Sequence, residues 1–175
     1  TCKICTTCYP NRKNLLLQKR LNMRILGIGN AIVDVICKVD DDFIIKNNLA
    51  KSTMKLFFDE NEFKNLLTNL KIEKTVSGGS VANSIVGLSQ LGDKVGFIGK
   101  VSDDDFGSKY EEGLKKEKVE YFYSKKKEEL PTGTCLILIT PDSERTMCTF
   151  LGTAGKINEN DVSSNAIKQS EIVFL

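Results

Sequence analysis

Two adjacent glycines stand directly before a predicted helix in the segment Ser77-Gly78-Gly79-Ser80-Val81-Ala82-Asn83. Glycine lets a ligand approach the bare backbone, and the unpaired N–H groups at a helix N-terminus favour hydroxyl and anionic oxygens. Asn83, about one turn into the helix, carries both a donor and an acceptor. The segment therefore predicts a site for a small polar ligand, formed by Gly78, Gly79 and Asn83. Taken alone, the two glycines could equally form an ordinary turn.

A carboxylate interrupts the apolar, β-branched run of residues 31–39. Most carboxylates are solvated, so an exposed position on an edge strand is one interpretation of Asp34. The other is a ligand-binding edge, where the carboxylate accepts hydrogen bonds from neighbouring sugar hydroxyls. Asn30, four residues earlier, reaches the same cleft if the strand bends. Arg145 opens a later strand; many such arginines are merely solvated, but the planar guanidinium suits phosphate.

Several kinds of chemistry are excluded. Gly27-Ile28-Gly29 begins like a dinucleotide-binding fingerprint, but the third glycine is missing and β-branched residues follow where a helix is required. We therefore expect a strand that bends at glycine and continues. The chain contains no histidine, which excludes Ser-His-Asp and Cys-His catalysis and any His-ligated metal within it.

Composition indicates an ordinary globular domain, because 175 residues are 41% apolar and 27% charged. A net charge of +2 gives no case for nucleic acid or an anionic membrane as a partner, and the longest apolar run is far shorter than a spanning helix needs. Three cysteines, Cys37, Cys135 and Cys148, lie in apolar runs and are expected to be buried free thiols, as the reducing cytoplasm permits.

The first 22 residues differ in character from the rest of the chain. The short apolar run Leu15-Leu16-Leu17 is no secretory signal, and Met23 is the first methionine, directly before the first predicted strand. We expect residues 1–22 to be a non-native or disordered extension outside the fold. Cys2, Cys5 and Cys8 in this segment have a spacing that could begin a metal site, but a fourth clustered ligand is missing, so we expect no metal there.

Strands alternate with helices along the rest of the chain, which predicts an α/β fold with a mainly parallel sheet flanked by helices. Extra β segments near 31–39, 55–58 and 132–151 do not fit simple βαβ units, and we expect them to form a small second sheet over one end of the first. The last strand, 172–175, has no covering helix after it, so we expect the chain to be the N-terminal part of a longer protein, truncated at the C-terminal side. The expected strands are 24–29, 31–39, 55–58, 94–98, 119–124, 132–140, 145–151 and 172–175, and the expected helices are 43–47, 59–70, 80–90, 106–118 and 158–169.

Residues 23–175 resemble the N-terminal half of the ribokinase/PfkB carbohydrate kinase family, and within it are most similar to the adenosine kinases. The resemblance rests on several segments that occur in the family's order and at about its spacing. They are GNAIVDV (29–35), SGGSVANSIVGLSQLG (77–92), FIGKVSDDDFG (97–107), PTGTCLILIT (131–140) and ERTMCTFLG (144–152).

The resemblance implies a role for each matched position. Asp34 would accept hydrogen bonds from ribose or sugar hydroxyls, while Asn30, Gly78, Gly79 and Asn83 would hold the same sugar. The second sheet would be a lid that closes over the substrate. The lid and the walls around the substrate's base would include Leu56, Cys135, Met147 and Thr149, and Arg145 would approach the transferred phosphate when the lid closes.

The resemblance also implies an ATP- and Mg²⁺-dependent kinase acting on the primary hydroxyl of a nucleoside, with adenosine as the leading candidate. The alternatives are a sugar kinase of the ribokinase or fructokinase type, or a non-catalytic nucleoside- or sugar-binding fragment.

The family's general base lies in a Gly-Ala-Gly-Asp-like motif, which this sequence lacks. We expect the base to lie C-terminal to Leu175, so we expect no catalytic residue and no turnover in residues 1–175 alone. Family lids cover the site within one chain or pair between two, and both a monomer and a homodimer are compatible with this sequence.

Overall fold

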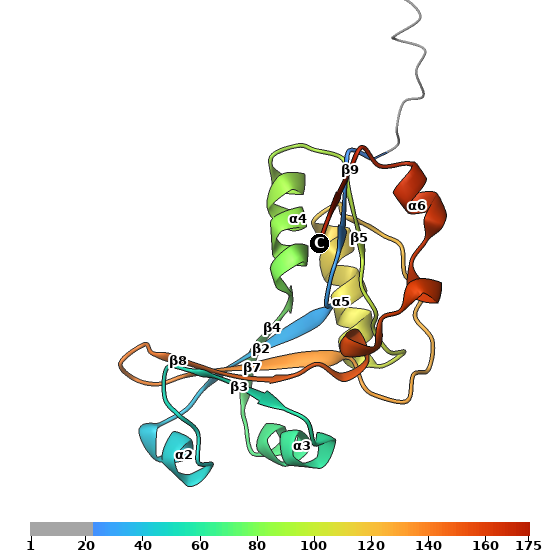
Figure 1. The fold of residues 1–175 in the computed structure, drawn as a ribbon. Coiled ribbons are helices and arrows are strands. Elements are labelled where there is room, and N and C mark those ends of the chain that lie inside the picture. Colours follow the sequence, from blue (N-terminus) through green and yellow to red (C-terminus); the bar gives the residue numbers. More distant parts are fainter. Residues whose placement is uncertain (1–22) are drawn as a thin grey trace, which may run out of the picture.

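The chain forms two β-sheets that meet where the first strand ends and the second begins (Figure 1). The structure, a computed structural model, describes residues 23–175. The first sheet has the order β6-β5-β1-β9, and all of its strands are parallel. Its strands are β1 (Ile25–Ile28), β5 (Val95–Ile98), β6 (Glu120–Tyr121) and β9 (Ile172–Phe174).

Helices cover both faces of this parallel sheet (Figure 1). On one face, α4 (Ser80–Gln90) and α5 (Asp105–Lys116) bury Ile85, Tyr110 and Leu114 against Phe97. On the other face, Leu26 packs with Ala166 of the short helix α6 (Ser164–Lys168).

The second sheet has the order β3-β8-β7-β2-β4 and mixes parallel with antiparallel pairs. β7 and β8 form an antiparallel hairpin, whereas β2 runs parallel to β7 and antiparallel to β4 at the edge. The strands are β2 (Ile32–Lys38), β3 (Met54–Phe57), β4 (Ile72–Gly78), β7 (Gly133–Ile139) and β8 (Arg145–Phe150).

The two faces of the second sheet differ. Alternate residues such as Val35, Leu136 and Cys148 are fully buried and belong to the core shared with the first sheet. Helices α2 (Asp41–Lys46) and α3 (Glu60–Thr68) lie below this face in Figure 1. The opposite face, which we call the open face, carries exposed apolar side chains, among them Met54 (64% exposed). Two 3₁₀ turns, η1 (Gly152–Lys156) and η2 (Glu159–Asp161), lead from β8 towards α6.

Most of the predicted elements are confirmed. As expected, a strand and no helix follows Gly27-Ile28-Gly29, but β1 and β2 are separate strands of different sheets and not one bent strand. Asp40 and Asp59 accept hydrogen bonds at the starts of α2 and α3, which explains why these helices begin there. Cys37, Cys135 and Cys148 are buried free thiols. No helix within residues 23–175 is long and apolar enough to cross a bilayer.

Several predictions of secondary structure were wrong in type or extent. The sequence pattern predicted no strand over residues 72–78, where β4 lies. The expected helix 158–169 is broken into η2 and α6, because Asn158 caps the first and Ser163 caps the second. The expected strand 119–124 is reduced to β6, since only two of its residues pair with β5. The proposed extension 1–22, with its cysteines, lies outside the described residues.

The expected last strand is also slightly too long. The prediction extends it to Leu175, but β9 ends at Phe174. The pairing of β9 with β1 covers only Ile172, Val173 and Phe174. Leu175 therefore stands outside the sheet, and its side chain is 80% exposed.

Candidate functional site

The two glycines of the opening motif lie against the two polar residues that the sequence associates with them. Gly78 ends β4, and a Cβ at this position would overlap the carboxylate of Asp34. Gly79 has φ +101, and a Cβ there would overlap the backbone carbonyl of Asn30. Only glycine permits both approaches, so the structure brings Asn30, Asp34, Gly78 and Gly79 together where the two sheets meet.

The same glycines leave the start of α4 accessible. Gly79 is the N-cap residue of α4 and offers no side chain to its free N–H groups. The backbone N–H of Asn83 donates to the carbonyl of Gly79 at 2.8 Å, which fixes Asn83 one turn into the helix. The Asn83 side chain is exposed and lines a hollow of about 460 Å³ beside β4. Asp34 is not one of the residues lining this hollow, but its cross-strand neighbour Val76 is.

Asp34 is not on an exposed edge. It lies in β2 between β4 and β7 and is half-buried, and its carboxylate receives no hydrogen bond or ion pair from any residue in 23–175. Burial raises the pKa of this carboxyl above its ordinary value. The charge of Asp34 also adds to the raised pKa of the buried Tyr110 hydroxyl, although desolvation is the larger cause. A half-buried carboxylate without a partner is suited to accept hydrogen bonds from a ligand.

Four of the predicted substrate residues share one face of the second sheet. Register pairing puts Asp34 opposite Cys135, Cys135 opposite Thr149, and Thr149 opposite Leu56. They therefore form a single row across four strands on the open face, because directly opposed residues point the same way. The hydroxyl of Thr149 donates to the sulfur of Cys135 at 3.2 Å. Met147 lies in the next row along β8.

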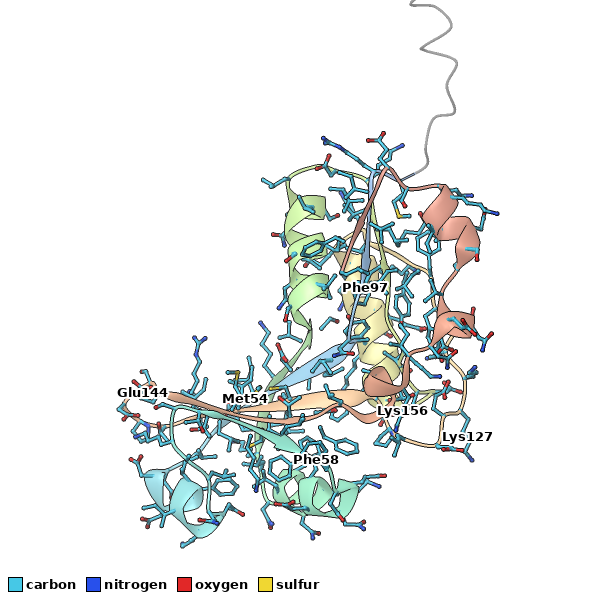
Figure 2. All side chains as sticks on the ribbon, viewed as in Figure 1. Met54, Phe58, Phe97, Lys127, Glu144 and Lys156 are labelled. Carbon is cyan, nitrogen blue, oxygen red and sulfur yellow. The ribbon has the colours of Figure 1, made fainter. Side chains whose placement is uncertain are left out.

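Arg145 is on the same face but at a distance. It opens β8 opposite Ile139, four residues from Thr149, which corresponds to about 13 Å along a strand. Figure 2 shows its neighbour Glu144 at the tip of the β7–β8 hairpin, far from the start of α4. The structure thus does not bring Arg145 to Asp34, and an approach to a shared ligand would require sheet movement.

Leu175, after which the general base is expected, lies just outside the other sheet. It directly follows β9, the edge strand beside β1, and so takes no place in the row on the open face. Of the residues predicted to bind substrate, the structure gathers Asn30, Asp34, Gly78 and Gly79 at the junction of the sheets, and their role in binding stays a prediction.

Tyr110 is a site residue that sequence reasoning missed. Its hydroxyl donates to the carbonyl of Gly78 at 3.3 Å, and its own carbonyl accepts from the Ser77 hydroxyl at 3.1 Å. The side chain is fully buried behind the glycines. Its position on an amphipathic helix was visible in the sequence, but nothing local distinguishes it from an ordinary core aromatic.

Asp104 also does more than cap a helix. It accepts a hydrogen bond from the backbone N–H of Gly107 at the start of α5. Its carboxylate additionally accepts from the backbone N–H of Thr132 at 2.8 Å and from the Thr132 hydroxyl at 2.7 Å. This contact joins FIGKVSDDDFG to PTGTCLILIT, two of the recognised segments, just before β7 begins.

Comparison with known proteins agrees with this arrangement. The family model for pfkB family carbohydrate kinases matches residues 28–175. The chain belongs to the pfkB carbohydrate kinase family. The resemblance inferred from the sequence motifs is therefore confirmed, and the close approach of Gly78 to the Asp34 carboxylate lies inside the matched region.

Among sequence relatives, a 5-dehydro-2-deoxygluconokinase of Mesomycoplasma hyopneumoniae is 29% identical over 140 residues, covering 79% of this chain and 40% of that protein. A fructokinase of Escherichia coli is 40% identical over 74 residues, covering 42% of this chain and 24% of that protein. This pfkB-family chain thus spans less than half the length of the curated relatives it matches.

Among solved structures, an adenosine kinase from Sinorhizobium meliloti matches with a TM-score of 0.77 and 31% identity, over 87% of this chain and 46% of that one. A probable sugar kinase from Rhizobium etli matches with a TM-score of 0.76 and 30% identity, over the same two fractions. The expected ribokinase-like α/β fold is confirmed. The relatives divide between nucleoside and sugar kinases, so the comparisons identify the family but not one particular substrate.

Proposed function

We propose that this chain is the substrate-binding part of a kinase that phosphorylates the primary hydroxyl of a nucleoside, with adenosine as the first candidate. The observation that carries the proposal is the contact of Gly78 with the Asp34 carboxylate beside the uncapped start of α4. A carboxylate acceptor, free helix N–H groups and the amide of Asn83 together suit the neighbouring hydroxyls of a ribose.

The open face favours a nucleoside over a simple sugar. Beyond Asp34, the side chains on this face are mainly apolar, including Leu56, Val76 and Met147, which are 36–40% exposed. Exposed apolar side chains gathered on one surface commonly mark a binding site. A planar base has apolar faces to cover them, whereas a hexose would present further hydroxyls to side chains that cannot pair with them.

The proposed chemistry needs few protein groups. ATP with Mg²⁺ would supply the transferred phosphoryl group, and catalysis of such transfers consists mainly of positioning and charge stabilisation. In this chain, Asp34, Asn30 and Asn83 would orient the sugar, and Arg145 would approach the phosphate when the second sheet closes as a lid. Closure would also exclude water, which limits wasteful hydrolysis of ATP.

The general base is expected outside the matched segments. Gly152-Thr153-Ala154-Gly155 is followed by Lys156, so it is no Gly-Ala-Gly-Asp motif. We expect the base and most of the nucleotide site beyond Leu175, in the part of the relatives' length that this chain does not match. Buried free thiols such as Cys37 fit a cytoplasmic enzyme. Both a monomer and a homodimer paired through the open face fit the proposal.

Calorimetric titration of the full-length protein with adenosine, ribose and fructose tests the proposal. We expect adenosine to bind most tightly and the Asp34→Asn variant to lose that binding. An ATP-dependent turnover assay should then yield phosphorylated adenosine from the full-length protein and none from residues 1–175. Failure of the full-length protein to bind or phosphorylate any of the three compounds would contradict the proposal.

A sugar kinase is the second candidate, and the sequence relatives favour it. The 5-dehydro-2-deoxygluconokinase and the fructokinase were found by sequence, with 29% and 40% identity. If this candidate is correct, ribose or fructose should bind at least as tightly as adenosine. The Leu56→Ala variant distinguishes the two candidates, because it should weaken the binding of a nucleoside and leave the binding of a sugar unchanged.

A further inference from the structure

A buried lysine lies directly after β5 and takes no part in the proposed substrate site. The side chain of Lys100 is 7% exposed, and its Nζ lies 3.3 Å from Glu128 Oε2 and 3.1 Å from Asp161 Oδ2. Both carboxylates are themselves largely buried, at 14% and 5% exposure. Such a buried ion cluster adds little net stability, because desolvation offsets the attraction, so its purpose must be sought in its position.

The two carboxylates flank the base of the β7–β8 hairpin, one before β7 and the other after β8. Glu128 lies in the segment that leads from β6 into β7, and Asp161 ends η2, in the segment that leads out of β8. In Figure 2, Lys127 and Lys156 mark these two segments on the same side of the molecule. One ammonium group therefore joins the segment before the hairpin to the segment after it, and both to β5.

Each carboxylate is also tied to its own segment. Glu128 Oε1 accepts from the Tyr123 hydroxyl at 2.6 Å, and Asp161 Oδ2 accepts from the Asn158 backbone N–H at 3.1 Å. A pull on either carboxylate is consequently transmitted to the backbone around it. Lys126 Nζ is a more distant cation, 3.8 Å from Glu128, and is largely exposed.

The loop that carries Lys100 holds the hairpin at further points. The backbone N–H of Asp103 donates to the carbonyl of Lys126 at 2.9 Å, and Asp104 holds Thr132 through two hydrogen bonds. The backbone N–H of Thr153 donates to the carbonyl of Pro131 at 2.9 Å, which joins the two ends of the hairpin directly. Among these contacts, Lys100 alone engages both ends through one group.

We propose that Lys100 is a positioning residue that clamps both segments at the base of the β7–β8 hairpin to the end of β5 and so sets the angle of the open face relative to the start of α4. The hairpin carries Cys135, Met147 and Thr149 on the open face. The angle of this face therefore decides how these side chains contact a ligand held by Asp34. The positioning role rests on the proposed function, but the clamp itself is a property of the fold and can be tested without substrate.

Hydrogen–deuterium exchange of the intact protein tests the clamp. In Lys100→Met, amides of both segments, 122–132 and 157–162, should exchange about tenfold faster or more, because charged hydrogen bonds are lost from both. In Glu128→Gln only the first segment should loosen, and in Asp161→Asn only the second. Amides of β1 and α4 should be unchanged. The two carboxylate variants each keep a balanced ion pair, so they remain informative even if Lys100→Met does not fold.

A matched control is Lys51→Met. Lys51 also bridges two carboxylates, Asp41 and Asp142, but on the exposed surface within the second sheet's own loops. The Lys51→Met variant should leave hydrogen exchange in segments 122–132 and 157–162 unchanged. Lys100→Arg, which keeps the charge, should retain much of the protection that Lys100→Met loses. The proposed clamp would be contradicted if each carboxylate variant sped up exchange equally in both segments, or if Lys100→Met sped it up in neither.

Substrate binding completes the test. Lys100→Met should raise the dissociation constant for adenosine about tenfold, while Lys51→Met should not change it. Absence of adenosine binding in the unsubstituted protein would contradict the proposed function and leave the exchange result to decide the clamp. Faster exchange in both segments with unchanged adenosine affinity would overturn the positioning role of Lys100.

Discussion

The two sheets differ in how far their apolar side chains are buried. In the first sheet, all four residues of β5 are buried, and helices cover both faces; the edge strand β9 is exposed along its length. In the second sheet, β7 and β8 bury alternate residues, and α2 and α3 lie on the side away from the open face, whose apolar side chains remain exposed. A sheet that is covered on both sides stabilises the fold, whereas an exposed apolar face commonly marks a binding site.

The largest expected effect lies in the covered sheet. Phe97 is fully buried and packs near Tyr110 and Tyr121, with ring centroids 6.2 and 6.4 Å away. Phe97→Ala should lower the free energy of unfolding by about 3–5 kcal/mol, since it leaves a cavity. Met54→Ala on the open face should change it by no more than about 0.5 kcal/mol. Figure 2 shows both positions. Urea unfolding measures the difference, and equal losses would contradict the contrast between the sheets.

The next effect is on ligand affinity at the junction of the sheets. Asp34→Asn removes a charged acceptor from the proposed sugar site, so adenosine affinity should fall about a hundredfold or more. Glu73→Gln, an exposed carboxylate on the neighbouring strand β4, is the control and should leave affinity unchanged. Titration calorimetry measures both, and an Asp34→Asn variant with normal affinity would remove Asp34 from the site.

A smaller effect is expected from the backbone at the junction. Gly79→Ala forces a side chain into φ +101 and into the carbonyl of Asn30, which should cost about 1–3 kcal/mol of stability. Gly87→Ala, in the middle of α4 with open space around its Cα, should instead add about 0.4–1 kcal/mol. Thermal unfolding of the pair measures the contrast. A tolerated Gly79→Ala would show that the tight approach is not required.

The smallest expected effect is a dependence on pH. Burial raises the pKa of Asp34, so between the unfolded and folded pKa values the native chain binds more protons than the unfolded one. Stability due to this group therefore falls as pH rises through that window, and the penalty is fully present once the pH exceeds the folded pKa. Asp34→Asn should melt a few degrees higher at pH 7, and the difference should vanish below about pH 4. A variant that melts lower at pH 7 would contradict this.

Much of the junction could be predicted because its residues are close in sequence. Gly78, Gly79 and Asn83 lie within two turns of the start of one helix, so their spacing alone predicts that they are close together. Asp34 was marked by its apolar neighbours. β4 was missed because it is an edge strand with one open face, and Ile72-Glu73-Lys74-Thr75-Val76 lacks a clear alternation of apolar and polar residues.

Contacts between distant segments could not be predicted. Lys100, Glu128 and Asp161 look like ordinary surface charges in the sequence, and their partners are 28 or more residues apart. The row formed by Asp34, Cys135 and Thr149 depends on strand order and register, which no local pattern specifies. The family resemblance, rather than any property of the residues themselves, indicated their common site.

The sulfur of Cys135 has a chemical consequence for the proposed site. It lies in the middle of the row between Asp34 and Thr149. Burial raises the pKa of its thiol, the hydrogen bond from Thr149 partly offsets this rise, and the Asp34 charge adds a smaller increase. Only the thiolate attacks electrophiles and peroxides at an appreciable rate. Near neutral pH this group should consequently resist alkylation and oxidation, so the proposed binding face would keep its shape under oxidative stress that modifies more acidic cysteines.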